Sequence, residues 1–282
     1  MRATAGVSKT ASNPAGLLLR QWRDVRGKTQ LGLSFDAGVS QKHISFVESG
    51  RSIPSRQMLL DLAQALDIPL RERNGLLVAA GYAPLYSDQA LDAPIMNGIA
   101  RALQRMLRQH EPFPAIVMDR HWNVLMTNDA APRLFNCFID MAVRPSPRNL
   151  LHLMFDPAGM RPFVANWPET ARGLLARVYR EALGHVIDEK MKALLVELSQ
   201  YPGVKPEWGA PSPNDVMPII PLTLVKDGVR LNYFSMITTV GTPQTVTAEE
   251  LRIECMFPAD DATESGHGRF IQTHSTHRYA HH

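Results

Sequence analysis

The sequence contains only two cysteines, Cys137 and Cys255, and their separation has no metal-ligand spacing. This excludes a disulfide scaffold and fits a reducing compartment. No apolar run reaches the roughly eighteen residues that a membrane-spanning helix needs, and the N-terminus has no signal-peptide core. A glycine-rich phosphate loop, an HExxH zinc motif and a GxSxG elbow are also missing from the sequence. These absences predict a cytoplasmic protein that does not act on membranes and is not an enzyme.

The composition is typical of a folded, globular protein with one basic half. A chain of 282 residues is long enough for about two domains, each able to bury a core of its own. The formal charge is +3, but it is unevenly distributed. Residues 1–83 hold 11 lysines and arginines against six acidic residues, an excess of five, whereas residues 84–282 hold 19 against 21. A basic N-terminal part favours a phosphate-bearing partner.

Residues 30–51, QLGLSFDAGVSQKHISFVESGR, predict two short helices that meet at a tight turn. Leu33 and Ala37 lie one turn apart on the first helix, and Gly38 can end that helix in the left-handed conformation. Ser40 can cap the second helix. Such a pair can project its second helix from the surface into a major groove. The alternative is an αα-hairpin inside an all-helical core.

This stretch resembles the helix-turn-helix of the XRE-type family, which is named for the lambdoid phage repressors. Gln30 matches the family's phosphate-contacting glutamine, and Gly38 matches its turn residue. Ser40-Gln41-Lys42-His43 match the opening of the recognition helix, and Glu48-Ser49-Gly50-Arg51 match its closing signature. The resemblance implies that Arg23 forms a structural ion pair with Glu48; the alternative is that Arg23 contacts DNA. It also implies a homodimer on palindromic double-stranded DNA.

The residue types at these positions suit DNA chemically. Gln41 can make paired hydrogen bonds to an adenine edge, and Lys42 can reach guanine or a phosphate. The amide of Gln30 and the guanidinium of Arg51 suit phosphate oxygens. The DNA-binding residues that we expect are Gln30, Ser40, Gln41, Lys42, His43, Ser45, Ser49 and Arg51.

Residues 14–84 predict five helices, of which the last begins after Pro69. Residues 1–13 are rich in Ser, Thr, Ala and Gly and predict a disordered tail. Arg2 and Lys9 could make this tail a minor-groove arm, and the alternative is a solvated tail without a role.

The following part of the chain carries a second resemblance. Its motifs are Pro69–Asn74, Ala79–Pro84, Phe113-Pro114-Ala115, Trp122–Leu125, Asn128, Ala130-Ala131, Leu134-Phe135, Arg148–Leu151 and Phe155. They resemble bacterial regulators whose second part is the MmyB-like ligand-binding domain. Together with the helix-turn-helix, the resemblance covers roughly residues 14–257. It implies a PAS-like pocket for a small apolar ligand such as a fatty acid, with no required cofactor.

The residue pattern of this second half indicates the same outline. An amphipathic helix is expected at residues 95–110, within a linker of residues 85–111, because Ile and Leu recur four apart. This helix either joins two subunits or packs on its own domain. Residues 115–118 and 122–127 are β-rich, and Asn128 can cap the helix that follows.

Helices are expected from 161 to 199, with a break at Gly184. The dipeptide Asp227-Gly228 between two alternating runs predicts a hairpin with a type I′ turn. Residues 251–257 alternate as one more strand. Residues 112–260 should therefore form an α+β, PAS-like domain, in which helices lie on an antiparallel sheet.

Seven apolar side chains are candidates for the ligand pocket, although aromatic and Met residues also form ordinary cores. They are Trp122, Met126, Phe135, Phe155, Phe163, Tyr233 and Met236. Residues 261–282 are rich in histidine, including His267, His274, His277, His281 and His282. Their irregular spacing predicts an unstructured tail, and the alternative is a metal-binding segment; we expect no metal site.

The sequence thus predicts a transcription regulator with an all-α, five-helix helix-turn-helix domain and a ligand-controlled α+β domain. In a second hypothesis the C-terminal domain only dimerises or binds a partner. The third and least favoured hypothesis is an enzyme fused to a DNA reader.

Overall fold

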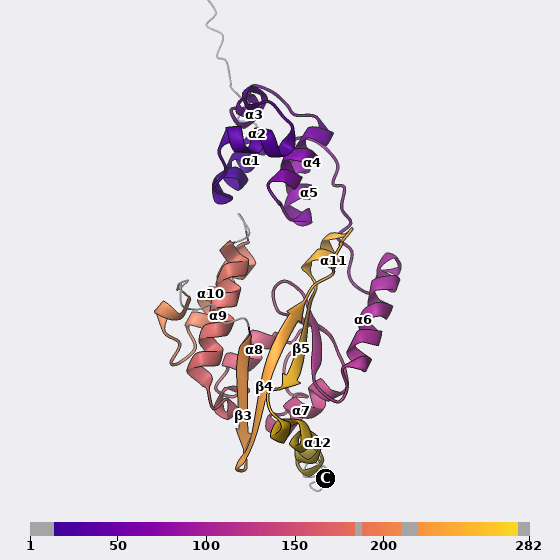
Figure 1. Ribbon diagram of the computed structural model, residues 1–282, viewed down its shortest axis with the longest axis vertical. Helices are drawn as coiled ribbons and strands as arrows, with labels where there is room; N and C mark the ends of the chain where they lie inside the picture. Colours follow the sequence, from indigo (N-terminus) through magenta and orange to yellow (C-terminus); the bar gives the residue numbers. More distant parts are fainter. Residues whose placement is uncertain (1–13, 184–187, 210–218, 276–282) are drawn as a thin grey trace, which may run out of the picture. The chain divides into compact units, whose positions relative to one another are not determined.

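The computed structural model describes residues 14–183, 188–209 and 219–275 (Figure 1). The chain divides into two compact units. Unit 1 contains the residues up to Asp88 together with Pro243–Glu249, and unit 2 contains the remainder. The expected N-terminal tail of residues 1–13, the break at Gly184, and His277, His281 and His282 lie outside the described residues. No helix in the described part of the chain is long and apolar enough to cross a membrane.

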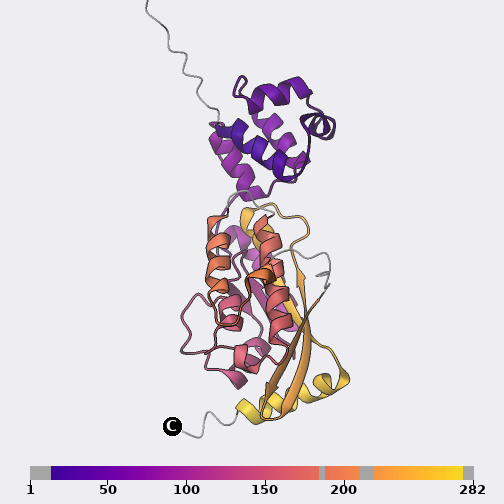
Figure 2. The same cartoon turned by 90° about the vertical axis from the view of Figure 1, so that its left-hand side faces the viewer.

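Unit 1 contains the five expected helices, which have indigo to purple colours in Figure 2. They are α1 Pro14–Val25, α2 Gln30–Ala37, α3 Gln41–Glu48, α4 Arg56–Ala65 and α5 Leu70–Ala79. Gly38 ends α2 with φ 64°, in the left-handed region. The Ser40 side chain accepts a hydrogen bond from the backbone N–H of His43 and so caps α3. The turn and cap predicted from the sequence are therefore present.

The core of unit 1 holds α1 very close to α3. Leu19 and Trp22 on α1 and Ile44 and Val47 on α3 are all buried. A Cβ atom added at Gly16 would lie 2.2 Å from the backbone carbonyl oxygen of Val47. Only a glycine at this position lets the two helices approach so closely.

Residues 243–249 belong to unit 1, although they lie in sequence between strands β4 (Val229–Thr238) and β5 (Arg252–Pro258). The short helix α11, Val246–Glu250, begins there, and Val246 is completely buried. Its N–H donates to the Ser87 carbonyl at 2.9 Å, and the Glu249 carboxylate accepts from the Leu70 N–H at 2.7 Å. No sequence pattern predicted this helix, because its buried residues pack against distant parts of the chain.

Unit 2 is built on a five-stranded antiparallel sheet of order β2-β1-β5-β4-β3. The strands are β1 Ala115–Met118, β2 Val124–Thr127, β3 Ile220–Lys226, β4 Val229–Thr238 and β5 Arg252–Pro258. Asp227 and Gly228 have φ values of 50° and 78° between β3 and β4. Two consecutive positive φ values match the type I′ turn that the sequence predicted.

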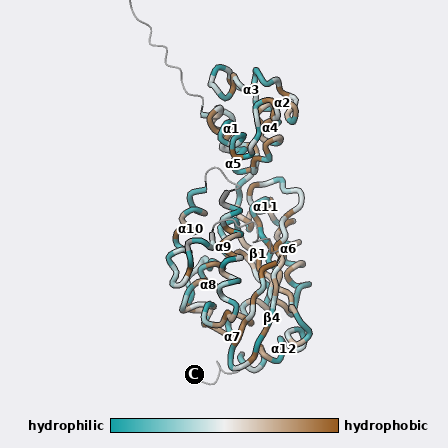
Figure 3. The backbone as a smooth tube through the Cα atoms, turned by 60° about the vertical axis from the view of Figure 1, so that its left-hand side comes forward, coloured by the Kyte–Doolittle hydropathy of each residue, from teal (hydrophilic) through white to brown (hydrophobic). Residues whose placement is uncertain are grey.

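Helices cover both faces of this sheet (Figure 1). The helical elements of unit 2 are η1 Pro94–Met96, α6 Asn97–Gln109, α7 Ala130–Phe138, α8 Leu150–Phe155, η2 Arg161–Phe163, α9 Trp167–Leu183, α10 Glu189–Ser199, η3 Pro206–Gly209 and α12 Asp261–Ser275. Leu103 and Leu107 of α6 pack with Val117 and Cys255 on one face. Helices α7 to α10 pack on the other face, and β1 is hydrophobic along its whole length (Figure 3). Helix α6 therefore packs on its own domain through Leu103 and Leu107.

The expected unstructured histidine tail is wrong for residues 261–275, which form α12. Thr263, His267 and Phe270 lie on one helical face and are buried. His267 bridges two partners: Nε2 donates to the Pro112 carbonyl at 2.9 Å, so Nδ1 accepts from the Tyr233 hydroxyl at 2.6 Å. Burial lowers the pKa of His267. Hydrophobic periodicity did not predict α12, because its buried face includes a neutral, polar histidine.

Asn128 caps α7 as the sequence predicted, although it lies two residues before the first residue of the helix, Ala130. Its side-chain oxygen accepts from the N–H of Ala131 at 3.2 Å and also from the N–H of Ala115 at 3.0 Å. The same side chain therefore joins the start of α7 to the start of β1.

Candidate functional site

The outer face of α3 presents polar side chains. Gln41 and Lys42 are exposed on its first turn, and Ser45 and Ser49 follow Gln41 at intervals of four residues. Residues four apart lie on one side of a helix, so these side chains form a continuous strip. Arg51 is exposed directly beyond the helix. The strip therefore presents amide, ammonium, hydroxyl and guanidinium donors on one surface.

Two cations of this surface are held over one aromatic ring. The Lys42 Nζ lies 5.6 Å and the Arg51 Cζ 5.9 Å from the centroid of the Phe46 ring. Such cation–π contacts hold the charges close to α3. His43 is half-buried, with Nε2 3.5 Å from the Ser52 hydroxyl. Its ring is therefore directed toward the loop after α3.

Behind this strip, Arg23 of α1 and Glu48 of α3 form a bidentate ion pair. Arg23 Nε lies 2.7 Å from Glu48 Oε1, and Nη2 lies 3.0 Å from Oε2. The two side chains are only 11% and 4% exposed. The hydrogen bond to Glu48 is the main cause that raises the pKa of Arg23 above its ordinary value. The pair fixes the orientation of α3 in the domain.

Gln30 belongs to the same network. Its Nε2 donates to Glu48 Oε2 at 2.9 Å, so the amide links the first turn of α2 to α3. The Gln30 side chain is half-buried and thus lies at the edge of the surface that includes Gln41. Ser40 is exposed at the start of that surface.

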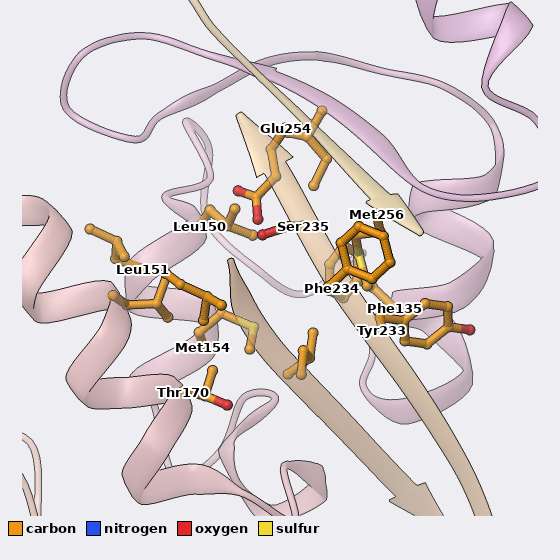
Figure 4. Close-up of a pocket in the computed structure, with 14 residues that line it drawn as sticks. Phe135, Leu150, Leu151, Met154, Thr170, Tyr233, Phe234, Ser235, Glu254 and Met256 are labelled. Carbon is orange, nitrogen blue, oxygen red and sulfur yellow. The ribbon is translucent and has the colours of Figure 1, made fainter. Parts of the chain in front are cut away.

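Unit 2 contains an apolar cavity between its helical layer and its sheet, which we call the sheet cavity (Figure 4). It is lined by Ile116, Phe135, Leu150, Leu151, Met154, Thr170, Leu174, Ile220, Leu222, Tyr233, Phe234, Ser235, Glu254 and Met256. The enclosed volume is about 40 Å³. That volume is below the roughly 300 Å³ at which small-molecule pockets begin.

A neighbouring cavity shares Ile116, Phe135 and Leu150 with the sheet cavity. It encloses about 310 Å³ and also contacts Arg148 and Asn149. The two cavities therefore adjoin at these three side chains. A space of about 310 Å³ is at the lower end of the size of small-molecule pockets.

The structure brings only two of the seven expected pocket residues into the sheet cavity. Phe135 and Tyr233 line it. Trp122 and Phe155 are fully buried parts of the core, as the alternative reading of such residues allowed. Phe163 is partly buried, and its ring packs against Phe138 at an angle of 58°.

Met126 and Met236 are corrections to the predicted lining. Met126 pairs with Val117, and Met236 pairs with Cys255. Side chains that are directly opposite in a sheet share a face, and Val117 and Cys255 face α6. Both methionines therefore point away from the sheet cavity.

The lining residue that sequence reasoning missed most clearly is Glu254. The alternating strand pattern placed Ile253 and Cys255 inward and Glu254 outward. Helices cover both faces, so Glu254 is also buried, at 8% exposed. The sequence of β1 could have predicted this burial, because all four of its residues are apolar, and an apolar strand of that kind indicates a sheet covered on both faces. In the structure every residue of β1 is buried.

Comparison with known proteins agrees with this geometry. Residues 99–266 match the family described as the MmyB-like transcription regulator ligand binding domain, and residues 19–73 match a helix-turn-helix family. No curated protein matches the chain. One similar solved structure is titled "Structure of an RNA-binding Light-Oxygen-Voltage Receptor", with 11% identity, coverage of 98% of this chain and 69% of that chain, and a TM-score of 0.26. A similarity of that size supports no structural argument.

Proposed function

The chain belongs to the family of the MmyB-like transcription regulator ligand-binding domain and carries a helix-turn-helix, and from this premise we propose that it is a cytoplasmic regulator that reads a palindromic DNA site as a homodimer under the control of a small apolar ligand. These matches are to a regulator family and a DNA-binding motif, not to enzymes. The observation that carries the proposal is the presence of an exposed polar α3 and an apolar cavity in one chain.

In the proposed DNA complex, α3 enters the major groove. Gln41 reads a base edge, while Lys42, Gln30 and Arg51 contact the phosphate backbone. Ser40, His43, Ser45 and Ser49 surround them. The bidentate pair of Arg23 and Glu48 supports this surface from behind.

Substitution of Gln41 and Lys42 separates base reading from phosphate binding. Gln41→Ala is expected to cost about 1–3 kcal/mol at one base position, whereas Lys42→Ala should weaken binding to all sites alike and lower the salt slope by about one. Binding to a set of single-base operator variants at several salt concentrations measures both effects. Gln57→Ala is the matched control, since Gln57 is bonded to Asp61 on α4 and lies outside α3. An equal loss at all base positions for Gln41→Ala would contradict its base-reading role.

In the proposed control mechanism, the ligand occupies the sheet cavity and the neighbouring cavity. A ligand changes DNA binding only if it has different affinities for the two states of the protein. The favoured route changes the geometry of the dimer, and so the half-site spacing, through α6 and the residues before it.

The structure offers a second route through residues 243–250. Glu249 accepts a hydrogen bond from the first residue of α5 within unit 1. Glu250 is the next residue; it belongs to unit 2, where Arg120 pairs with it at 2.9 Å and with Asp188 at 2.5 Å. A displacement of Glu250 would therefore move the adjacent Glu249, whose carboxylate accepts from the first N–H of α5.

One observation favours a second candidate function. The sheet cavity encloses only about 40 Å³, which suits a packed core. In this alternative the C-terminal domain only dimerises or binds a partner.

Native mass spectrometry of the purified, untagged chain, followed by solvent extraction, distinguishes the two. The proposed function expects a dimer that carries about one apolar small molecule per chain. A dimer without an adduct, which also fails to bind any member of an apolar ligand library, would favour the dimerisation module.

A further inference from the structure

The sheet cavity has one polar end. Its lining is largely apolar, and Thr170, which also lines it, donates its hydroxyl to the Pro221 carbonyl at 2.9 Å. The Tyr233 hydroxyl is used by His267. The remaining polar groups are Ser235 on β4 and Glu254 on β5, and Figure 4 shows the two side chains next to each other at one end of the lining.

The Glu254 carboxyl is not fully satisfied by the protein. The Ser235 hydroxyl hydrogen-bonds to it, yet Oε2 is buried and has no hydrogen-bond partner among the residues that the structure describes. Burial is the main cause that raises the pKa of this carboxyl, and the Ser235 and Arg177 side chains act in the opposite direction. A buried acceptor without a partner is costly and uncommon.

A matching donor lies nearby. Arg177 of α9 has a buried Nη1 that also has no partner within the described ranges. Its positive charge lowers the pKa of Glu254, although Arg177 Nη1 and Glu254 Oε2 share no hydrogen bond within the described residues. Arg177 and Ser235 line one shallow depression, and Ser235 also lines the sheet cavity. Ser235 is therefore common to the space that Glu254 lines and the space that Arg177 lines.

We propose, on the basis of the function proposed above, that Glu254, Ser235 and Arg177 form a head-group subsite for an amphiphile with an uncharged hydroxyl head. The hydroxyl bonds to Glu254 Oε2 and accepts from Arg177 Nη1. Its alkyl body lies against Phe135 and Leu150 and extends into the neighbouring cavity of about 310 Å³.

A hydroxyl fits this end better than the other common heads. It donates and accepts, so it satisfies Oε2 whether or not the Glu254 carboxyl is ionised. An ether can only accept. An ionised carboxylate can only accept, so it leaves Oε2 without a donor whenever the proton is not on Oε2.

The test compares decanol with methyl nonyl ether, which has the same formula, and with decanoate, by calorimetric titration of the full chain. Decanol should bind about tenfold more tightly than the ether, because the ether leaves a buried acceptor unpaired. Decanoate should also bind more weakly than decanol. Equal binding of decanol and ether, tighter binding of decanoate, or no binding of any of the three would overturn the subsite.

Variants identify the residue responsible. Glu254→Met keeps the length of the side chain but removes the acceptor, and should reduce the preference for decanol over the ether to about onefold. Thr170→Val is the matched control and should retain the preference, since the Thr170 hydroxyl is already bonded within the protein. Arg177→Met should weaken decanol and ether together and provides an independent variant if Glu254→Met does not fold. An unchanged preference in Glu254→Met would contradict the proposal.

Operator affinity, measured in parallel, separates this inference from the proposed function. A decanol preference that depends on Glu254, without any change in operator affinity, supports the subsite and contradicts ligand control. A change in operator affinity with decanol and ether bound equally supports ligand control and overturns the subsite.

Discussion

Gly16→Ala is expected to destabilise the DNA-binding unit by about 3 kcal/mol or more, which is at the upper end of the usual cost of overpacking. The added Cβ would lie 2.2 Å from the Val47 carbonyl oxygen and 3.2 Å from the Glu48 Cα. These are backbone atoms, so no side chain can rotate away. The substitution forces α1 and α3 apart and with them the ion pair behind the recognition surface, so operator binding should fall as well.

Hydrogen–deuterium exchange of the full chain checks this expectation, because it reports local unfolding separately for the peptides of α1 and α3 and for those of β4 and β5. Gly75→Ala is the matched control: Gly75 is inside α5, with no atom within 4 Å of an added Cβ in the described structure. Alanine there should be stabilising by up to about 1 kcal/mol. Unchanged protection of α1 and α3 in Gly16→Ala would contradict the close packing of these helices.

Glu48→Ala is expected to cost about 3 kcal/mol, the lower end of the usual effect of breaking a buried ion pair from one side, because Arg23 keeps Asp24 and the Lys28 carbonyl as partners. The substitution removes the two Glu48 hydrogen bonds of the Arg23 guanidinium and the partner of the Gln30 amide. Since all three side chains orient α2 and α3, DNA affinity should fall even though Glu48 itself is buried behind the recognition surface.

Urea denaturation and operator titration of the same variant measure these two losses. Asp36→Ala is the control. Asp36 forms an ion pair with Lys28 at the surface, where the Asp36 side chain is 48% exposed and the Lys28 side chain 33% exposed. An exposed pair of this kind contributes about 0–1 kcal/mol. If Glu48→Ala and Asp36→Ala had equal effects, the structural role of the buried pair would be refuted.

The helix-turn-helix could be predicted from sequence because its determinants are local. Gly38 ends α2, Ser40 caps α3, and both act on backbone groups within four residues. The hairpin turn at Asp227-Gly228 is local in the same sense. Boundaries of these elements were therefore predicted to within a few residues.

The cavity could not be predicted in the same way, because periodicity shows that a residue is buried but not what it faces. The face of a side chain in a sheet depends on register between strands: Glu254 pairs with Ile116 on one side and Ile237 on the other. The pair of Glu254 with Ile116 joins residues more than a hundred positions apart. Met126 and Met236, with the right residue type, lie on the opposite face for the same reason.

Helices α11 and α12 were missed for a related reason. Val246 and Ala248 are buried in a helix of only five residues, too short to show a period. In α12, the buried face includes Thr263 and His267, which are polar, and their partners lie on distant strands and loops. Tertiary partners rather than composition decide the structure of these segments.

The central claim is that an apolar ligand in unit 2 controls DNA binding by α3. The most direct measurement is the affinity of the full chain for an operator selected from random DNA, determined by fluorescence anisotropy before and after removal of bound apolar material. We expect the two dissociation constants to differ by about fivefold or more, as coupling free energies of about 1–3 kcal/mol produce. Readdition of the extracted material should restore the first value. Equal dissociation constants in all three conditions would contradict the claim.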